Sequence, residues 1–222
     1  MSISSIRISI ATLVLLSVSS SGRADMVTLF AFPMVSQSER SWCWAASTEM
    51  ITQYYGHRVP QCSVALYYRG EVLGLMSTVH CCPTVTDAGC NIGGDLFNPL
   101  AKYGYSRTPY PYEAVTATAA INTMFFTRLQ SQISPPGVRR PTPSTTGGKP
   151  VGCEWRWAGG GYHTMIVTGA GMLDGVRHVM VHNPARGGVV WKLGHGYYLR
   201  SYDAALSHSL ANEYINIAPL TP

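Results

Sequence analysis

The pattern of apolar residues changes along the chain, from stretches of helical character to short alternating runs. Between Trp42 and Tyr55 there is neither Gly nor Pro and only one charged residue, and Gly56 follows as a stop signal. We predict a helix there, and two more at Cys62–Arg69 and Glu113–Gln132. In the last of these, Ala117, Ile121, Met124, Phe125 and Leu129 fall on related faces. Residues 38–133 are therefore predicted to be helix-rich.

A stretch without apolar period, residues 134–150, is dense in Pro, Gly, Ser and Thr and indicates a surface linker. After it the pattern is that of strands. The predicted strands are Val151–Trp157, Thr164–Thr168, His178–Val181, Gly188–Lys192 and Tyr214–Ile217. The predicted fold class is α+β, with a helical half, a half 151–222 built on an antiparallel sheet, and a cleft between them.

The first predicted helix carries the most informative residue. It is apolar nearly all round, which favours a buried helix whose N-terminus alone reaches the cleft. With Ser41 as the expected N-cap, Cys43 lies in the first turn, where unpaired N–H groups and the helix dipole stabilise an anion. A thiol there is expected to have a lowered pKa. The alternative is a cysteine that only packs in the core.

Two polar residues stand beside apolar runs in the strand region. His163 follows the glycines 159–161 and begins an apolar strand, so it can reach across a cleft. Asn183 ends the run 178–183 on the same strand face as Val179 and Val181. An antiparallel neighbour would bring its amide to the His163 ring. The alternatives are a core histidine and an ordinary Asn-Pro turn.

In these features the chain resembles the papain-like cysteine peptidases. The resemblance lies in Gln37 six positions before Cys43, in the Cys43-Trp44 pair, in His163 before an apolar strand, and in Asn183 at the end of the next one. The wording Trp-Cys-Trp-Ala-Ala and Gly-Gly-Tyr-His is most similar to a compact bacterial group that includes secreted avirulence peptidases of plant pathogens. After Asn183 the chain departs from the plant enzymes, because it reads Pro-Ala-Arg-Gly-Gly.

The resemblance implies a papain-like fold and a role for each matched residue. Cys43 is the expected nucleophile, His163 its base, and Asn183 the residue that orients the imidazole. The Gln37 side-chain N–H and the Cys43 backbone N–H are the expected oxyanion donors. The implied function is a cysteine endopeptidase acting on proteins or peptides. The same site would also suit an amidase, deamidase or transpeptidase, and a binding or toxin module that retains the fold without turnover is a further alternative.

The N-terminus has the composition of an export signal. Arg7 precedes an uncharged apolar run, residues 8–18, and small and polar residues follow as far as Ala24. We expect residues 1–24 to be a signal peptide and 25–222 to form one peptidase domain, secreted or periplasmic. The apolar run is shorter than the roughly 20 residues of a spanning helix, so no membrane attachment is expected after cleavage.

Charge adds little to this interpretation. The formal net charge is +5, and removal of the leader with its two arginines leaves 14 − 11 = +3. No basic stripe with interleaved aromatic residues is present, so we expect no nucleic-acid partner. No residue pattern calls for a cofactor, and a monomer is favoured.

The remaining cysteines agree with an exported protein. Cys62, Cys81, Cys82 and Cys90 are expected to form two disulfides, because they fall in a loop-rich stretch that a small core braces poorly. Since adjacent cysteines point in different directions, Cys81 and Cys82 should pair separately with the other two. Cys153 would stay free and buried. The alternative is a zinc site that uses this cluster and His80, although a repeated Cys-x-x-Cys pair is absent.

Overall fold

The structure is a computed structural model of the chain. It describes residues 25–75, 80–82, 88–111, 119–134, 148–156, 161–173, 176–185, 196–201 and 210–220. The expected leader 1–24, the expected strand 188–192 and most of the expected linker lie outside the described residues.

Helices and strands follow one another in the described chain in a mixed order. The helices are α1 (Cys43–Tyr54), α2 (Gln61–Tyr67), a π-helical turn η1 (Tyr68–Val72), a 3-10 turn η2 (Ala88–Cys90), α3 (Phe97–Lys102) and α4 (Ala119–Ile133). The strands are β1 (Asp25–Thr28), β2 (Tyr105–Pro111), β3 (Val151–Arg156), β4 (Tyr162–Leu173), β5 (Val176–Asn183), β6 (Gly196–Ser201) and β7 (Leu210–Pro219).

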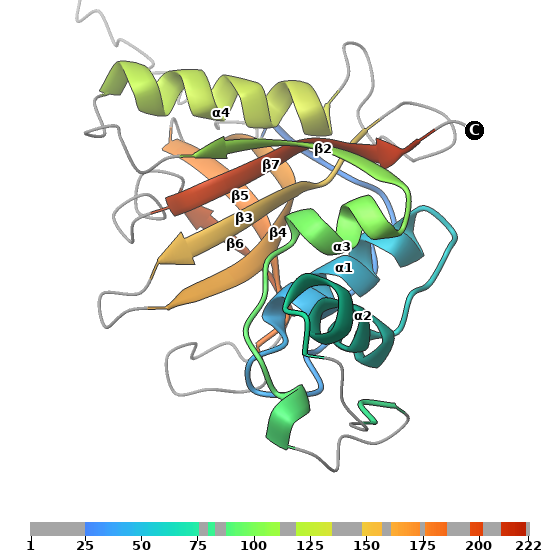
Figure 1. The fold of residues 1–222 in the computed structure, drawn as a ribbon. Helices are drawn as coiled ribbons and strands as arrows, with labels where there is room; N and C mark the ends of the chain where they lie inside the picture. The colour runs from blue at the N-terminus through green and yellow to red at the C-terminus, as the bar shows by residue number, and fades with distance from the viewer. Residues whose placement is uncertain are drawn as a thin grey trace, which may run out of the picture.

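The strands of the described chain join in one antiparallel sheet with the order β2-β7-β3-β4-β5-β6 (Figure 1). The long strand β4 is its centre. It pairs with β5 along 166–173 on one edge, and on the other with β3 along 162–167 and then β1 along 169–172. Both ends of β4 are thereby fixed, which positions the residues at its entrance.

The helices lie on two sides of this sheet. In Figure 1, α1, α2 and α3 gather on one side and α4 crosses the other. Contacts agree, because α1 packs on β4 and α2 packs on α1, whereas α4 contacts β4, β1 and β3. The predicted α+β class, with the Cys43 helix packed against an antiparallel sheet, is confirmed.

The helix-rich part is shorter than predicted. Strand β2 falls inside the range 38–133 and joins the sheet edge through β7, and α4 packs on strands of the sheet. Alternation is weak in β2, which contains Pro109 and Pro111, so its sequence gives no clear strand pattern. The helical side of the cleft therefore ends at α3.

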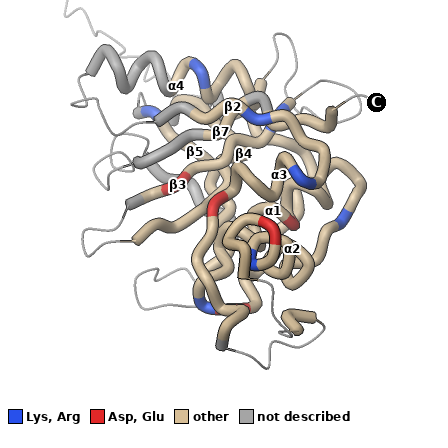
Figure 2. The backbone as a smooth tube through the Cα atoms, viewed as in Figure 1, with Lys and Arg blue, Asp and Glu red and all other residues tan. Residues whose placement is uncertain are grey.

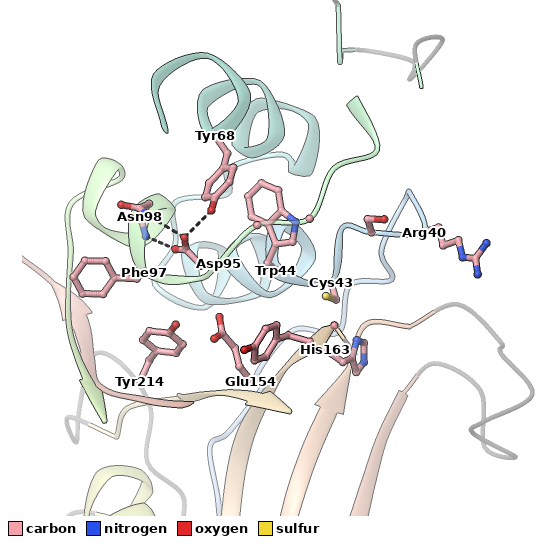
Figure 3. A pocket seen from close by; sticks show the side chains of 15 residues that line it. Arg40, Cys43, Trp44, Tyr68, Asp95, Phe97, Asn98, Glu154, His163 and Tyr214 are labelled. Atoms are coloured by element: carbon pink, nitrogen blue, oxygen red, sulfur yellow. Dashed lines mark hydrogen bonds between the residues drawn. The ribbon is translucent and has the colours of Figure 1, made fainter. Parts of the chain in front are cut away.

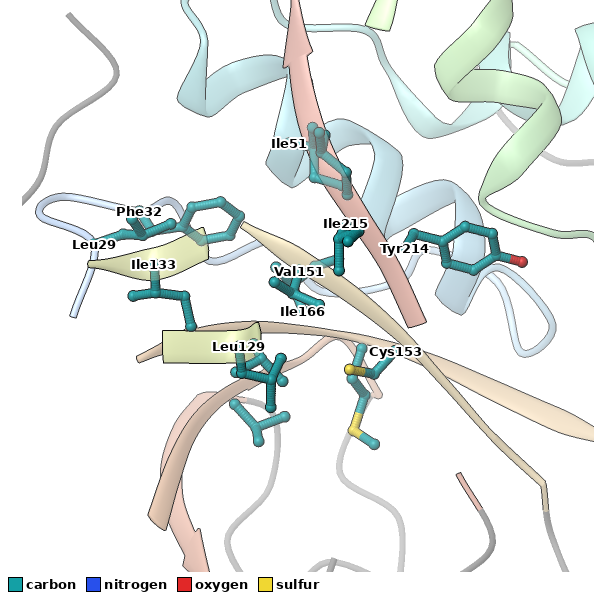
Figure 4. Packing of buried hydrophobic residues seen from close by; sticks show 14 of the residues in the cluster. Leu29, Phe32, Ile51, Leu129, Ile133, Val151, Cys153, Ile166, Tyr214 and Ile215 are labelled. Atoms are coloured by element: carbon teal, nitrogen blue, oxygen red, sulfur yellow. The ribbon is translucent and has the colours of Figure 1, made fainter. Parts of the chain in front are cut away.

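The core connects both layers of helices through the sheet. Val151 and Cys153 of β3 are buried in one cluster with Leu129 and Ile133 of α4 (Figure 4). Trp155, the next alternate residue of β3, belongs to the same cluster. Met50 and Ile51 of α1 belong to the same cluster. Rigid packing of this kind holds α1 and β4 in a fixed relation.

Candidate active site

The N-terminus of α1 opens into a cavity of about 970 Å³. Figure 3 shows Cys43 and His163 beside one another in this cavity and Asp95, Phe97 and Tyr214 away from them. The cavity is lined by Arg40, Ser41, Cys43, Trp44, Tyr68, Gly93, Gly94, Asp95, Phe97, Asn98, Glu154, Gly161, Tyr162, His163 and Tyr214.

Cys43 is held between the helix and the sheet. It is the first residue of α1, with 9% of its surface exposed, and its Sγ accepts a hydrogen bond from the Thr164 N–H at 3.4 Å. One turn further on, the Ser47 hydroxyl donates to the Thr164 carbonyl at 3.4 Å. Thr164 therefore fixes the thiol beside His163, its neighbour in β4.

The start of α1 differs in detail from the expected one. The N-cap is Trp42, which makes no side-chain cap, and the predicted cap Ser41 instead donates its backbone N–H to Asn91 Oδ1 at 2.8 Å. The expectation for Ser41 was wrong. As in any helix, the first-turn N–H groups have no intrahelical acceptor, so the Cys43 N–H faces the cavity end of the helix without a side-chain cap.

His163 and Asn183 are brought together by the pairing of β4 with β5. His163 Nε2 lies 2.8 Å from Asn183 Oδ1, and both side chains are buried. Asn183 Oδ1 also accepts the Ala185 backbone N–H at 2.9 Å. The juxtaposition expected from the strand pattern is thus present.

The Ala185 N–H decides how the imidazole is protonated. A backbone donor needs an acceptor, so the Asn183 atom facing it is the oxygen and not the amide nitrogen. His163 Nε2 must then donate to that oxygen. In the neutral ring this leaves the lone pair on Nδ1, which is the form that can take a proton from a thiol.

Burial acts on the charges of both groups. It raises the pKa of the Cys43 thiol, and the Glu154 carboxylate adds to this, against the N–H donors of Thr164 and Trp44. Burial lowers the pKa of His163, against the hydrogen bond to Asn183. The lowered thiol pKa expected from the helix position is therefore wrong for this buried site. Both shifts favour a neutral thiol beside a neutral imidazole.

Gln37 lies in the loop before α1, but its amide is occupied. The buried Nε2 donates to the carbonyls of Glu39 at 2.9 Å and Arg40 at 2.6 Å, and Gln37 is absent from the residues that line the cavity. Its backbone N–H donates to the Pro184 carbonyl, next to Asn183, at 2.8 Å. The structure thus brings Gln37 to the site's edge without pointing a free N–H into the cavity.

A loop that the sequence analysis did not assign to the site forms one cavity wall. The Trp42 indole donates to the Cys90 carbonyl at 2.7 Å and the Trp44 indole to the Ile92 carbonyl at 3.2 Å. Beyond them, a Cβ on Gly94 would lie 2.6 Å from the Trp44 ring, whereas one on Gly93 would meet open space. Gly94 therefore allows the loop to lie directly on Trp44, the residue after Cys43.

The far end of the cavity is polar. The Tyr68 hydroxyl donates to Asp95 Oδ2 at 2.8 Å, and Tyr214 donates to the Glu154 carboxylate. Burial raises the pKa of both phenols, so each remains protonated. Glu154 is only 6% exposed. No pattern around Glu154 in the sequence marks it, because it becomes a cavity residue only through the pairing of β3 with β4.

The remaining cysteines pair as predicted. Disulfides join Cys62 to Cys82 and Cys81 to Cys90, and Cys153 is free and buried. The four paired thiols are not available as zinc ligands, which excludes the zinc alternative for this cluster. Among the described residues, no group of three or more His, Cys, Asp or Glu side chains is placed to hold a metal ion.

Comparison with known proteins gives fold-level likeness only. No protein-family profile and no curated protein matches the chain. One similar solved structure is a double glycine motif protease from an AMS/PCAT transporter in complex with the leader peptide, with 15% identity, a TM-score of 0.39, and 84% of this chain and 91% of that chain covered. Another, from work on the mite allergens Blo t 1 and Der p 1, has 15% identity, a TM-score of 0.38, and covers 87% and 68%. Function must follow from the site's own residues.

Charged residues are not concentrated in one part of the described chain. Figure 2 shows acidic and basic residues scattered over the described backbone. No helix within the described segments has both the length and the apolar character needed to cross a membrane.

Proposed function

We propose that the protein is a cysteine endopeptidase with Cys43 as nucleophile, His163 as base and Asn183 as the residue that orients the imidazole. The observation that carries the proposal is the chain of contacts from Ala185 through Asn183 to His163, with the Cys43 thiol held by the adjacent Thr164. These contacts do more than bury a histidine, because the neutral ring that they select keeps its lone pair on Nδ1, in a cavity that the Cys43 thiol also lines. These contacts support a nucleophile and base that act together.

The reaction begins from the neutral pair. His163 Nδ1 takes the Cys43 thiol proton as Sγ attacks the carbonyl carbon of the peptide bond, and a tetrahedral oxyanion forms. The imidazolium then gives that proton to the leaving nitrogen, and the C–N bond breaks. The products are an amine and a thioester on Cys43. Water, deprotonated by His163, cleaves the thioester, and the proton returns to the sulfur.

The oxyanion is stabilised at the start of α1. The Cys43 backbone N–H supplies one donor, supported by the positive end of the helix. Gln37 supplies the second when its amide exchanges one loop carbonyl for the oxyanion. An anion favours this exchange, because charge-assisted hydrogen bonds are about twice as strong as neutral ones. Each donor is expected to lower the barrier by about 3 kcal/mol.

The cavity suits a peptide substrate. Its volume of about 970 Å³ exceeds what a single small acyl group fills, and it extends from Cys43 to Phe97 and Tyr214. It combines aromatic walls with two acids, the half-buried Asp95 and the buried Glu154. We propose that this extension binds residues on one side of the scissile bond.

Export belongs to the same proposal. The leader-like residues 1–24 predict secretion or entry into a periplasm, and the disulfides Cys62–Cys82 and Cys81–Cys90 agree with an oxidising compartment.

Product analysis tests the proposal. The mature chain, residues 25–222, is incubated with a peptide library, and products are identified by mass spectrometry while ammonia is assayed in parallel. We expect new N-termini in the wild type and none in Cys43→Ala, with Cys153→Ala as the active control because Cys153 is a buried thiol outside the cavity. Ammonia release without chain cleavage would contradict the peptidase proposal and indicate a deamidase or amidase instead.

A further inference from the structure

The loop that carries Gln37 is held by a side chain from another element. Gln61, the first residue of α2, is buried, and its two amide atoms bond to the backbone on both sides of Gln37. Its Oε1 accepts the Ser38 N–H at 2.8 Å, and its Nε2 donates to the Ser36 carbonyl at 2.9 Å. Gln61 thus pairs with this segment as a neighbouring strand would.

Gln37 itself completes the arrangement. Its own N–H points away from Gln61 and bonds to the Pro184 carbonyl at 2.8 Å, directly after Asn183. The backbone at Gln37 is therefore fixed on one side by the helical layer and on the other by the end of β5. The loop that carries Gln37 thus connects the end of β5 at Asn183, the proposed orienting residue, to Gln61 at the start of α2.

Because of these bonds, the Gln37 side chain can reach only a few positions. With both flanking peptides fixed, its Nε2 reaches the carbonyls of Glu39 and Arg40, which lead into the first turn of α1. Within the described residues, Gln37 Oε1 is buried without a hydrogen-bond partner. A buried acceptor without a partner is unfavourable, so the loop is held against a local preference to rearrange.

We infer that Gln61 is a positioning residue for the reaction. It acts by holding Gln37 where the Gln37 amide can turn to the oxyanion. The inference rests on the proposed function. It assigns to Gln61 an effect on the transition state that a merely structural hydrogen bond would not have. Loosening the loop would leave substrate binding in the cavity almost unchanged, because Gln37 and Gln61 are not among the lining residues.

A double-mutant cycle tests this role. Steady-state kinetics are measured for the wild type, Gln61→Met, Gln37→Ala and the double variant, with a peptide that the wild type cleaves. Methionine matches the length of glutamine without its two hydrogen bonds. We expect Gln61→Met to lower kcat by roughly tenfold with KM unchanged, as for an interaction made only in the transition state. In the Gln37→Ala background it should change kcat by less than about twofold.

Thr52→Val is the matched control for lost hydrogen bonds. The buried Thr52 hydroxyl donates to the Glu49 carbonyl at 3.1 Å and accepts the Val59 N–H at 3.1 Å, so it also bonds twice to backbone. It lies toward the other end of α1 and should leave kcat within about twofold. Amide exchange at Ser38 should be faster in Gln61→Met than in Thr52→Val.

The outcomes separate the two proposals. If Gln61→Met lowers kcat no more than Thr52→Val does, or by equal factors with and without the Gln37 side chain, Gln61 is only structural and the peptidase proposal stands. If the wild type cleaves no peptide, the proposed function fails and the role of Gln61 with it. Should Gln61→Met not fold, Gln61→Glu, which keeps the acceptor for Ser38 and loses the donor to Ser36, replaces it in the same cycle.

Discussion

At the scale of single residues, the backbone N–H of Ala185 controls the chemistry of the site. It requires the oxygen of Asn183 as its acceptor, that oxygen requires a proton on His163 Nε2, and the lone pair that the proposed base needs is then on Nδ1 of the neutral ring. A neutral amide does this without stabilising the imidazolium as strongly as a carboxylate would. The residue choice at 183 should therefore set the pH range of the reaction.

Replacing Asn183 by aspartate changes the charge and keeps the shape. In the wild type, burial lowers the pKa of His163 below 6.5, so the ring stays neutral as pH falls through that value and the acid limb of kcat/KM lies below it. An aspartate at 183 favours the imidazolium and should move that limb upward by about one pH unit or more. Rate profiles of the two proteins decide this. Identical acid limbs of kcat/KM in the two proteins would show that protonation of His163 does not limit the rate.

At this scale the sequence singled out residues that the structure brings together, and it missed their environment. Residue type and neighbours were enough to single out Cys43, His163 and Asn183. The direction of the Cys43 pKa was not accessible, because it depends on burial by β4 and on Glu154, which is distant in sequence. The hydrogen bonds from Gln61 to the backbone of Ser36 and Ser38 were inaccessible for the same reason.

At the scale of elements, the site depends on how closely the loop 90–94 lies on α1. Two indoles of α1 and its approach bond to carbonyls of this loop, and the Cys81–Cys90 disulfide ties its beginning. Gly93 and Gly94 in this loop have different surroundings. Substitutions at the two positions can therefore be compared within one cavity wall.

Gly94→Ala should disturb the site, whereas Gly93→Ala should not. A Cβ at Gly94 would lie 2.6 to 2.9 Å from Trp44 ring atoms, and at Gly93 nothing lies within 4 Å. We expect Gly94→Ala to lower the free energy of unfolding by about 1–3 kcal/mol and to reduce kcat/KM by displacing Trp44. Denaturant unfolding and steady-state kinetics of both variants measure this. Equal behaviour of the two would contradict the packing of this loop on α1.

Elements with strong periodicity were predictable and those that depend on partners were not. The helix at Cys43 and the strands β3, β4, β5 and β7 follow from apolar pattern and glycine stops, and Gly56 has the positive φ of 84° expected after a helix. Strand β2 contains two prolines and exists through its pairing with β7. The placement of α4 on the far face of the sheet is equally a tertiary outcome.

At the scale of the whole molecule, a buried histidine outside the reaction should govern acid stability. His182 on β5 packs edge-on against Phe32 with ring centroids 5.0 Å apart, and burial lowers its pKa to about 4. The folded protein therefore resists protonation that the unfolded chain accepts near pH 6.5. Stability from this group is complete above that pH and is lost as pH falls toward 4.

The expected loss is about 3 kcal/mol in the free energy of unfolding between pH 6.5 and pH 4, the equivalent of that pKa difference. Urea unfolding at several pH values measures it. In His182→Leu this part of the slope should disappear, and in His57→Asn, which alters an exposed histidine, it should persist. A slope unchanged by His182→Leu would assign acid unfolding to other groups.

The proposed reaction passes through a covalent acyl intermediate on Cys43, which forms with help from His163. Acid-quenched intact-protein mass spectrometry during turnover of a peptide ester tests it most directly, with the modified residue located by proteolysis. We predict one acyl group on Cys43 in the wild type, far slower acylation in His163→Ala, none in Cys43→Ala, and no acyl group on Cys153. Turnover without an acyl group, or acylation of Cys43 at the same rate without His163, would contradict the account.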